Sequence, residues 1–73
     1  MAVYQSRVRE FREKKGISQE ALARELGVSR QTISNIEKGL NEPRVLLAIA
    51  LAAVLGAELI DLFRKALLLT ALR

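Results

Sequence analysis

The chain has 73 residues, of which 51% are hydrophobic, and it contains neither cysteine nor histidine. Disulfide bonds and the usual zinc ligand sets are therefore excluded, so packed apolar side chains must supply the stability. The formal net charge of +4 and the isoelectric point near 10.1 suit a polyanionic partner, although charge alone says nothing about fold. Leucine and alanine far outnumber the aromatic residues, and these good helix formers predict an all-α protein built as one domain.

Apolar residues at helical spacing indicate the first helix. Tyr4, Val8 and Phe11 recur on one face, with charged residues between them. The lysines at 14–15 suit the negative end of a helix, and Gly16 can adopt the left-handed conformation that ends one. The sequence therefore predicts an amphipathic helix that stops at this glycine.

A serine precedes each of the next two predicted helices, and a glycine separates them. Ser18 is a good N-cap for a helix over 19–26, which stops at Gly27. Ser29 begins a third helix over 30–37 in the same way. Apolar residues before and after each serine occupy the positions of a hydrophobic staple, which fixes the direction of the chain into the helix. Two short helices around a tight glycine turn are typical of a helix-turn-helix.

The outward face of the third predicted helix carries hydrogen-bonding side chains and no acidic residue. These side chains are Arg30, Gln31, Ser34 and Asn35. Arginine can donate to guanine O6 and N7, and glutamine can pair with adenine N6 and N7 in the major groove. Because a helix-turn-helix inserts the start of its second helix into that groove, this face predicts double-stranded DNA as the partner. A merely solvated helix face is the alternative interpretation.

The glycines, caps and apolar positions fall in register with one family pattern, carried by Gly16–Ala23, Leu26–Gly39, Pro43, Leu55-Gly56 and Leu62-Phe63. On these residues the chain closely resembles the Xre/Cro family of phage-repressor-like helix-turn-helix proteins, over about residues 4–63. The resemblance implies a five-helix fold like that of lambda repressor, with helices two and three as the helix-turn-helix. We therefore expect a single DNA-binding domain over 1–73, in which 58–73 form helix five with an apolar C-terminal extension.

The resemblance also implies roles for single residues, position by position. Base reading is expected of the outward face of helix three, at Arg30, Gln31 and Ser34, with Asn35 reading a base or a phosphate. Contacts to the DNA backbone are expected at four further residues, Gln19, Thr32, Lys38 and Arg44. Of these, Gln19 is also expected to brace the third helix. A buried ion pair between Arg12 and Glu37 is expected to join helix one to the end of helix three.

The fourth predicted helix, over 44–55, departs from the family because it is apolar all round. Relatives usually place polar residues on its outer face, which here carries Leu46, Ala50 and Ala53. The predicted core stripe is separate and consists of Val45, Ala48, Leu51, Ala52 and Leu55. A helix without a polar face implies burial on all sides, and one small domain does not provide that.

The chain beyond Phe63 continues this excess of apolar residues. A homodimer formed by helices four and five would cover both surfaces. The expected interface consists of Leu46, Ala50, Ala53, Leu67, Leu68, Ala71 and Leu72. A tail that is disordered or packs on its own monomer is the alternative.

The expected function is sequence-specific transcriptional regulation, as a repressor or autoregulator that binds a roughly palindromic operator as a homodimer. The alternatives are a protein-interaction module of the same fold without DNA binding, an antitoxin-like protein and a restriction–modification controller protein. No enzymatic activity is expected, because the chain offers no thiolate, imidazole base or metal cluster. Neither a cofactor, a metal nor a small-molecule ligand is expected.

The apolar run 45–55 is shorter than the roughly 20 residues that a membrane span needs. The N-terminal residues lack the long apolar stretch of a signal peptide. We therefore expect a cytoplasmic protein without a membrane partner.

Overall fold

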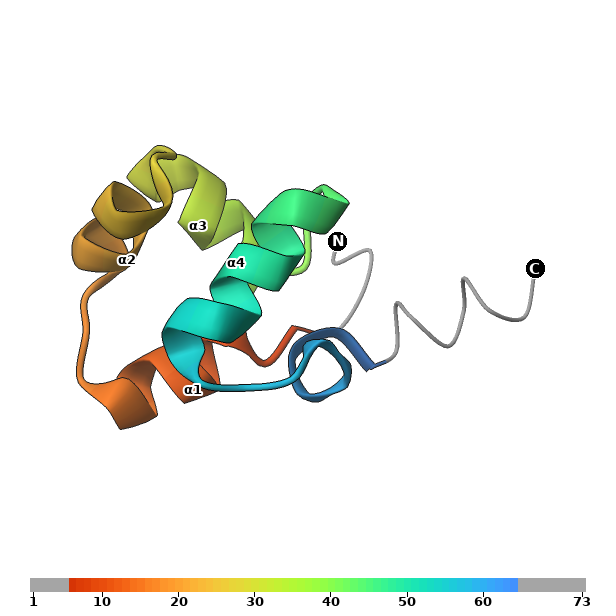
Figure 1. Cartoon of the computed structure of the whole chain (residues 1–73). Coiled ribbons are helices and arrows are strands. Elements are labelled where there is room, and N and C mark those ends of the chain that lie inside the picture. The colour runs from red at the N-terminus through yellow and green to blue at the C-terminus, as the bar shows by residue number, and fades with distance from the viewer. Residues whose placement is uncertain (1–5, 65–73) are drawn as a thin grey trace.

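Helices account for the regular structure of residues 6–64, which are the residues that the computed structural model describes. They are α1 (Val8–Lys15), α2 (Gln19–Leu26), α3 (Arg30–Glu37) and α4 (Val45–Leu55), followed by helical residues at 59–64 (Figure 1). This order confirms the predicted all-α, five-helix fold. None of the helices in the described part is long and apolar enough to cross a membrane.

The ends of α2 and α3 are set by local side-chain chemistry. Ser18 Oγ accepts a hydrogen bond from the backbone N–H of Ala21 at 3.0 Å, and Ser29 Oγ accepts one from Thr32 at 3.1 Å. Each bond satisfies a backbone donor that the first turn of a helix leaves free. Gly27 ends α2 at a φ of 70°, in the left-handed region. The predicted caps and glycine stop are therefore confirmed.

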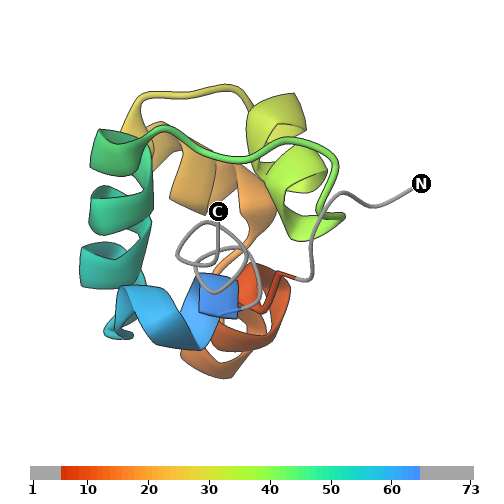
Figure 2. The same ribbon diagram turned by 90° about the vertical axis from the view of Figure 1, so that its right-hand side faces the viewer.

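The core lies where the five helices converge. Its most deeply buried side chains come from all five helices, and they are Val8, Leu22, Ile33, Ile36, Leu51 and Leu62. The helical residues 59–64 lie between α1 and α4 (Figure 2). A backbone hydrogen bond of 3.1 Å, from Arg7 N to the Leu62 carbonyl, joins this segment to the start of α1. The last helix therefore completes the core.

Two polar contacts fix the end of α4 and the start of the segment that follows it. Lys15 Nζ, at the end of α1, donates to the Val54 carbonyl at 2.6 Å, which places a cation at the negative end of α4. The backbone N–H of Glu58 donates to the Asp61 carboxylate at 3.2 Å. An acidic side chain three residues into a helix that bonds back to its start is one half of a capping box. Helix five therefore begins beside Glu58, as predicted.

The apolar faces of α4 differ from the prediction at one position. Val45, which we assigned to the core stripe, is 72% exposed, so that assignment is wrong. The buried residues of α4 are Leu51, Ala52 and Leu55, all in its second half, whereas Leu47 and Ala48 in its first turn are partly buried and pack against the core. Leu46 is 82% exposed.

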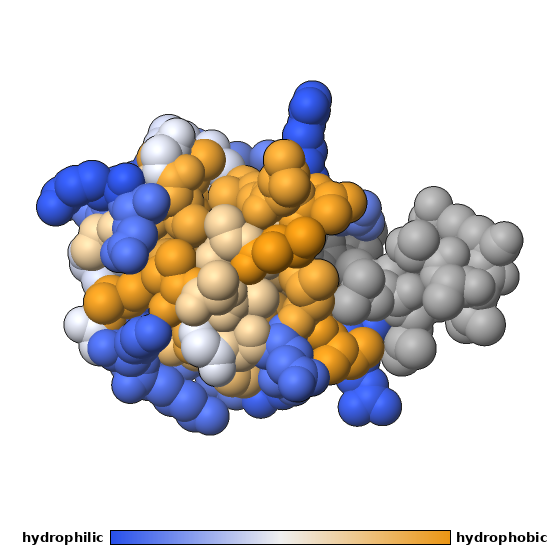
Figure 3. Space-filling view, viewed as in Figure 1, coloured by the Kyte–Doolittle hydropathy of each residue, from blue (hydrophilic) through white to orange (hydrophobic). Residues whose placement is uncertain are grey.

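Ile49, half exposed, extends this apolar surface along α4. Figure 3 shows the apolar side chains gathered over α4. Of the smaller residues expected in the dimer interface, Ala53 is exposed and Ala50 is partly buried. The other expected interface residues, Leu67, Leu68, Ala71 and Leu72, lie outside the described residues, as does Tyr4 of the first predicted helix.

Candidate DNA interface

The helix-turn-helix is built on a close crossing of α2 and α3. Ala23 is 3% exposed and lies in the same buried cluster as Ile33 and Ile36. The backbone N–H of Val28 donates to the Ala23 carbonyl at 3.0 Å and closes the turn. A small side chain permits the close approach of the two helices, and the buried isoleucines hold α3 against the core. The start of α3 is therefore presented by a fixed scaffold.

The outward face of α3 carries the four expected base readers together. Ile33 and Ile36 occupy the buried face, so the polar residues between them point away from the core. Arg30 and Gln31 are exposed, whereas Ser34 and Asn35 are half-buried. The first turn of α3 has no acidic residue. This face is therefore able to approach a polyanion and to hydrogen-bond with base edges.

Two of these readers contact each other. Gln31 Nε2 donates a hydrogen bond to Asn35 Oδ1 at 2.9 Å, along one turn of α3. Thr32, an expected backbone contact, forms a 2.8 Å hydrogen bond between its hydroxyl and that of Ser29. The hydroxyl of Thr32 therefore supports the cap of α3 in the free protein.

The structure brings Arg12 and Glu37 into contact beneath this face. Arg12 Nε donates to Glu37 Oε2 at 2.6 Å, and Arg12 Nη2 reaches Glu37 Oε1 at 3.4 Å. The side chains are 12% and 4% exposed, respectively. Arg12 Nη1 also donates to the Ile17 carbonyl at 2.8 Å, so the guanidinium binds α1, the α1–α2 turn and α3 together. Charges this deeply placed need such partners, because burial removes their hydration.

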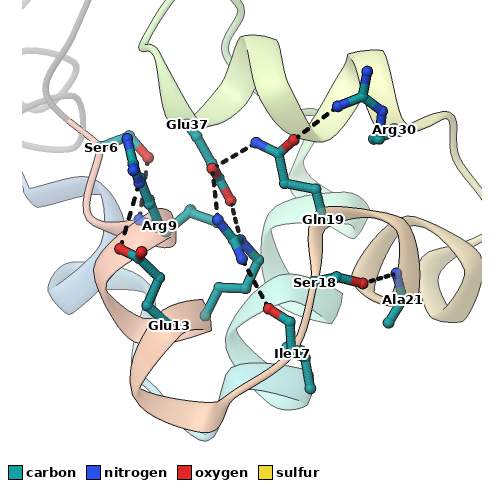
Figure 4. Close-up of polar contacts among 11 residues, drawn as sticks. Ser6, Arg9, Glu13, Ile17, Ser18, Gln19, Ala21, Arg30 and Glu37 are labelled. Atoms are coloured by element: carbon teal, nitrogen blue, oxygen red, sulfur yellow. Dashed lines mark hydrogen bonds and ion pairs between the residues drawn. The ribbon is translucent and has the colours of Figure 1, made fainter.

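Gln19 links this ion pair to the outward face. Its Nε2 donates to Glu37 Oε1 at 2.9 Å, and its Oε1 accepts from Arg30 Nη1 at 3.3 Å. Figure 4 shows Gln19 between Glu37 and Arg30. The amide is thereby oriented with its oxygen toward the arginine. The structure thus places Gln19 against the recognition helix, and its backbone lies in the first turn of α2, where N–H groups favour anions.

An open depression lies between α1, the start of α2 and the start of α3. Its lining consists of Arg9, Arg12, Ser18, Gln19, Glu20 and Arg30. Arg9 was not predicted from the sequence to lie near the candidate site. Its position could have been inferred, because it lies one helical turn from Arg12 and so shares the same face of α1. It forms a surface ion pair with Glu13 at 3.4 Å, which Figure 4 also shows.

The other two expected backbone contacts lie apart from this depression. Lys38 is the C-terminal cap of α3 and Arg44 is the N-terminal cap of α4, so they mark the two ends of the connection between these helices. Both are exposed. Neither of them lines the depression that Gln19 lines.

Shifted pKa values occur at the start of α1, outside the α2–α3 face. The hydrogen bond between Arg7 and the Glu10 carboxylate raises the pKa of Arg7 and lowers the pKa of Glu10. The cations of Arg7 and Lys14 also lie over the ring of Phe11, at 5.1 and 5.4 Å from its centroid. These contacts organise the surface of α1.

Comparison with known proteins decides the family. A family model described as helix-turn-helix matches residues 8–62, which include α1 to α4 and part of the last helical segment. The chain belongs to this helix-turn-helix family. The resemblance to Xre/Cro proteins is confirmed, and with it the placement of the helix-turn-helix at α2 and α3.

Sequence relatives of this helix-turn-helix protein are described as uncharacterized HTH-type transcriptional regulators. One from Archaeoglobus fulgidus is 48% identical over 58 residues, which cover 80% of this chain and 83% of the relative. One from Methanothermobacter thermautotrophicus is 46% identical over 54 residues, covering 74% and 78%. YgzD of Bacillus subtilis is 40% identical over 58 residues, covering 80% and 88%. The protein is therefore a DNA-binding transcriptional regulator.

A solved structure agrees with this assignment. The restriction-modification controller protein C.AhdI from Aeromonas hydrophila matches with a TM-score of 0.70 and 37% sequence identity. The match covers 78% of this chain and 86% of C.AhdI. The helix-turn-helix protein therefore shares both its fold and a substantial part of its sequence with a controller protein.

Proposed function

We propose that this protein represses or autoregulates transcription by binding a roughly palindromic operator as a homodimer. The observation that carries the homodimer is the exposed apolar surface of α4. Val45, Leu46 and Ile49 are 72%, 82% and 47% exposed, on a helix without a charged residue. Large contiguous apolar surfaces on small domains mark interaction sites. We take a second copy of the chain as the occupant.

The size of this surface suits a homodimer with a two-fold axis. Full burial of a valine, leucine or isoleucine side chain is worth about 1.5–3 kcal/mol. A two-fold interface counts each exposed side chain twice, once from each copy. For the exposed parts of these three side chains in both copies the total is about 6–12 kcal/mol, which is comparable with the roughly 4–15 kcal/mol that association costs in lost freedom. Ala50 and Ala53 are small enough to let two α4 helices approach closely.

The outward face of α3 supports operator binding by such a dimer. Two recognition helices that enter successive major grooves on one side of the duplex must lie about 34 Å apart. Each helix would read one half of a palindromic site. The combined affinity would then exceed that of a single copy, because the second half-site is bound intramolecularly.

The test of the homodimer is size-exclusion chromatography with light scattering. We expect the wild type to be dimeric at tens of micromolar, on the order of concentrations where weak self-association becomes visible. Leu46→Glu should give a folded monomer with reduced affinity for DNA. Leu40→Glu, at an apolar residue outside α4 that is 39% exposed, is the matched control and should remain dimeric. A monomeric wild type, or a dimeric Leu46→Glu variant, would refute the proposed interface.

Control of a restriction–modification system is a second candidate function. The similarity to the controller protein C.AhdI, at 37% identity, favours it. The test is whether the gene adjoins those of a restriction endonuclease and a DNA methyltransferase. Binding of the purified protein to the duplex upstream of its own gene would support autoregulation in either context. No shift of that duplex by the protein would contradict it.

A further inference from the structure

Two of the expected base readers are joined before any DNA is present. Gln31 and Asn35 are one turn apart on the outward face of α3, and the Gln31 side-chain amide donates to the Asn35 oxygen at 2.9 Å. We refer to this pair as the two-amide unit. Asn35 is half-buried and Gln31 is exposed. The hydrogen bond therefore ties the exposed side chain of Gln31 to a residue that lies closer to the core. The pair therefore presents a defined set of donors and acceptors.

The hydrogen bond changes what Gln31 is able to recognise. A carboxamide has two N–H donors and one oxygen acceptor. With one N–H directed to Asn35, Gln31 retains one donor and its oxygen. In the major groove adenine presents one donor and one acceptor, N6 and N7, whereas guanine presents two acceptors, O6 and N7. The retained groups match adenine, whereas guanine O6 would lie against the Gln31 oxygen.

We infer that Asn35 is a positioning residue that fixes Gln31 to select adenine and to reject guanine at one base pair of each half-site. This inference rests on the proposed operator binding and deepens it. An unrestrained glutamine is able to turn its NH2 group toward guanine, so the hydrogen bond to Asn35 removes that option. Asn35 keeps both of its own N–H donors for a neighbouring phosphate or base.

The first part of the experiment identifies the base pair that Gln31 reads. The full chain is used to select binding sites from a duplex library with a randomised core of about 20 bp, long enough for two half-sites one helical turn apart. The four base pairs are then compared at each selected position, with the wild type and with Gln31→Ala. The position at which Gln31→Ala removes the preference is the one Gln31 reads. We expect the wild type to favour adenine over guanine there by about 5- to 150-fold.

The second part tests the role of Asn35 with matched variants. Asn35→Asp keeps an oxygen acceptor for Gln31, so it should retain the adenine preference while lowering affinity for all sites, because the added charge repels phosphate. Asn35→Leu removes the acceptor at similar size, and the preference at the Gln31 position should fall below about threefold. Glu25→Gln, at an exposed residue of α2 to which no DNA contact is assigned, is the control and should leave that preference unchanged. Thermal melting of each variant confirms that it is folded.

Each outcome separates the inference from the proposed function. Selection of no sequence by the wild type would reject operator binding itself. A selected site with guanine at the Gln31 position would overturn the inference alone. An Asn35→Leu variant that keeps the full adenine preference would also overturn the inference. It would show that Asn35 does not position Gln31. Loss of preference with Asn35→Leu but not with Asn35→Asp supports the two-amide unit.

Discussion

Replacing Arg12 with methionine would keep an apolar stem of similar bulk and remove the charged guanidinium. The Glu37 carboxylate, 4% exposed, would then keep Gln19 as its donor and lose both contacts to the guanidinium. The 2.8 Å hydrogen bond to the Ile17 carbonyl would also be lost. Breaking a buried ion pair from one side typically costs about 3–5 kcal/mol, because the other charge stays buried without its partner.

This loss is large for a domain of this size. At about 0.05–0.15 kcal/mol per residue, a 73-residue domain has a total free energy of unfolding of about 4–11 kcal/mol. Each kcal/mol corresponds to about 4–8 °C in melting temperature for domains of 60–100 residues. We therefore expect Arg12→Met to lower the melting temperature by about 12 °C or more, as measured by circular dichroism at 222 nm.

Two further variants separate charge burial from general damage. The double variant Arg12→Met with Glu37→Leu removes both charges, and should recover about half of the loss or more, since apolar replacements of a buried pair are often neutral. Arg9→Met is the matched control, because the ion pair of Arg9 is at the surface and is worth less than about 1 kcal/mol. An Arg12→Met variant as stable as Arg9→Met would refute the reasoning. A double variant that loses as much as Arg12→Met alone would also refute it.

Three other outcomes are expected. Lys38→Ala should weaken binding to all sequences alike and reduce the slope of log affinity against log salt by about 1, measured by fluorescence anisotropy; an altered base preference would contradict a phosphate contact. Gly27→Ala should cost about 1–2 kcal/mol in urea unfolding, because the added Cβ meets nothing within 4 Å and only the left-handed backbone opposes it. Unchanged stability would show that this strain is absent. The pKa of Glu10 is lowered in the folded protein, so the Glu10 carboxylate stabilises the fold at a pH above its ordinary pKa. This stabilisation is lost as the pH falls through the lowered pKa. Arg7→Gln should return the pKa of Glu10 toward its ordinary value in an NMR titration, and identical titrations would exclude the hydrogen bond as the cause.

The helix boundaries were predictable because they depend on neighbours in the sequence. Ser18 and Ser29 cap the helices that follow them, and Gly27 ends α2, through contacts that span only a few residues. The register of the helix-turn-helix follows from the same short-range rules. The face of α3 that points outward was predictable for a related reason, since the burial of its isoleucines leaves the polar residues on the other side.

The exposure of Val45 and the side-chain contacts on α3 depend on how the helices pack in three dimensions. The pattern of residues along one helix does not determine that packing. The exposure of Val45 depends on which side of the first turn of α4 meets the core, and Leu47 and Ala48 occupy that side. The contact of Gln31 with Asn35, and of Gln19 with Arg30, depends on which rotamers the packed helices allow. A helical pattern shows that such residues are neighbours, but it does not show which of their amide groups donates.

The separation of the two faces of α3 has a consequence for how such regulators diverge. The buried isoleucines hold the helix in place, and the outward residues contribute no side chain to the core cluster. After a gene duplication, changes on that face can therefore redirect a copy to new sites without loss of its fold. Arg30 is the most constrained of these residues, because it contacts Gln19 and through it the buried carboxylate of Glu37. Divergence in DNA preference should accordingly begin at Gln31 and Asn35, and it should change them as a pair.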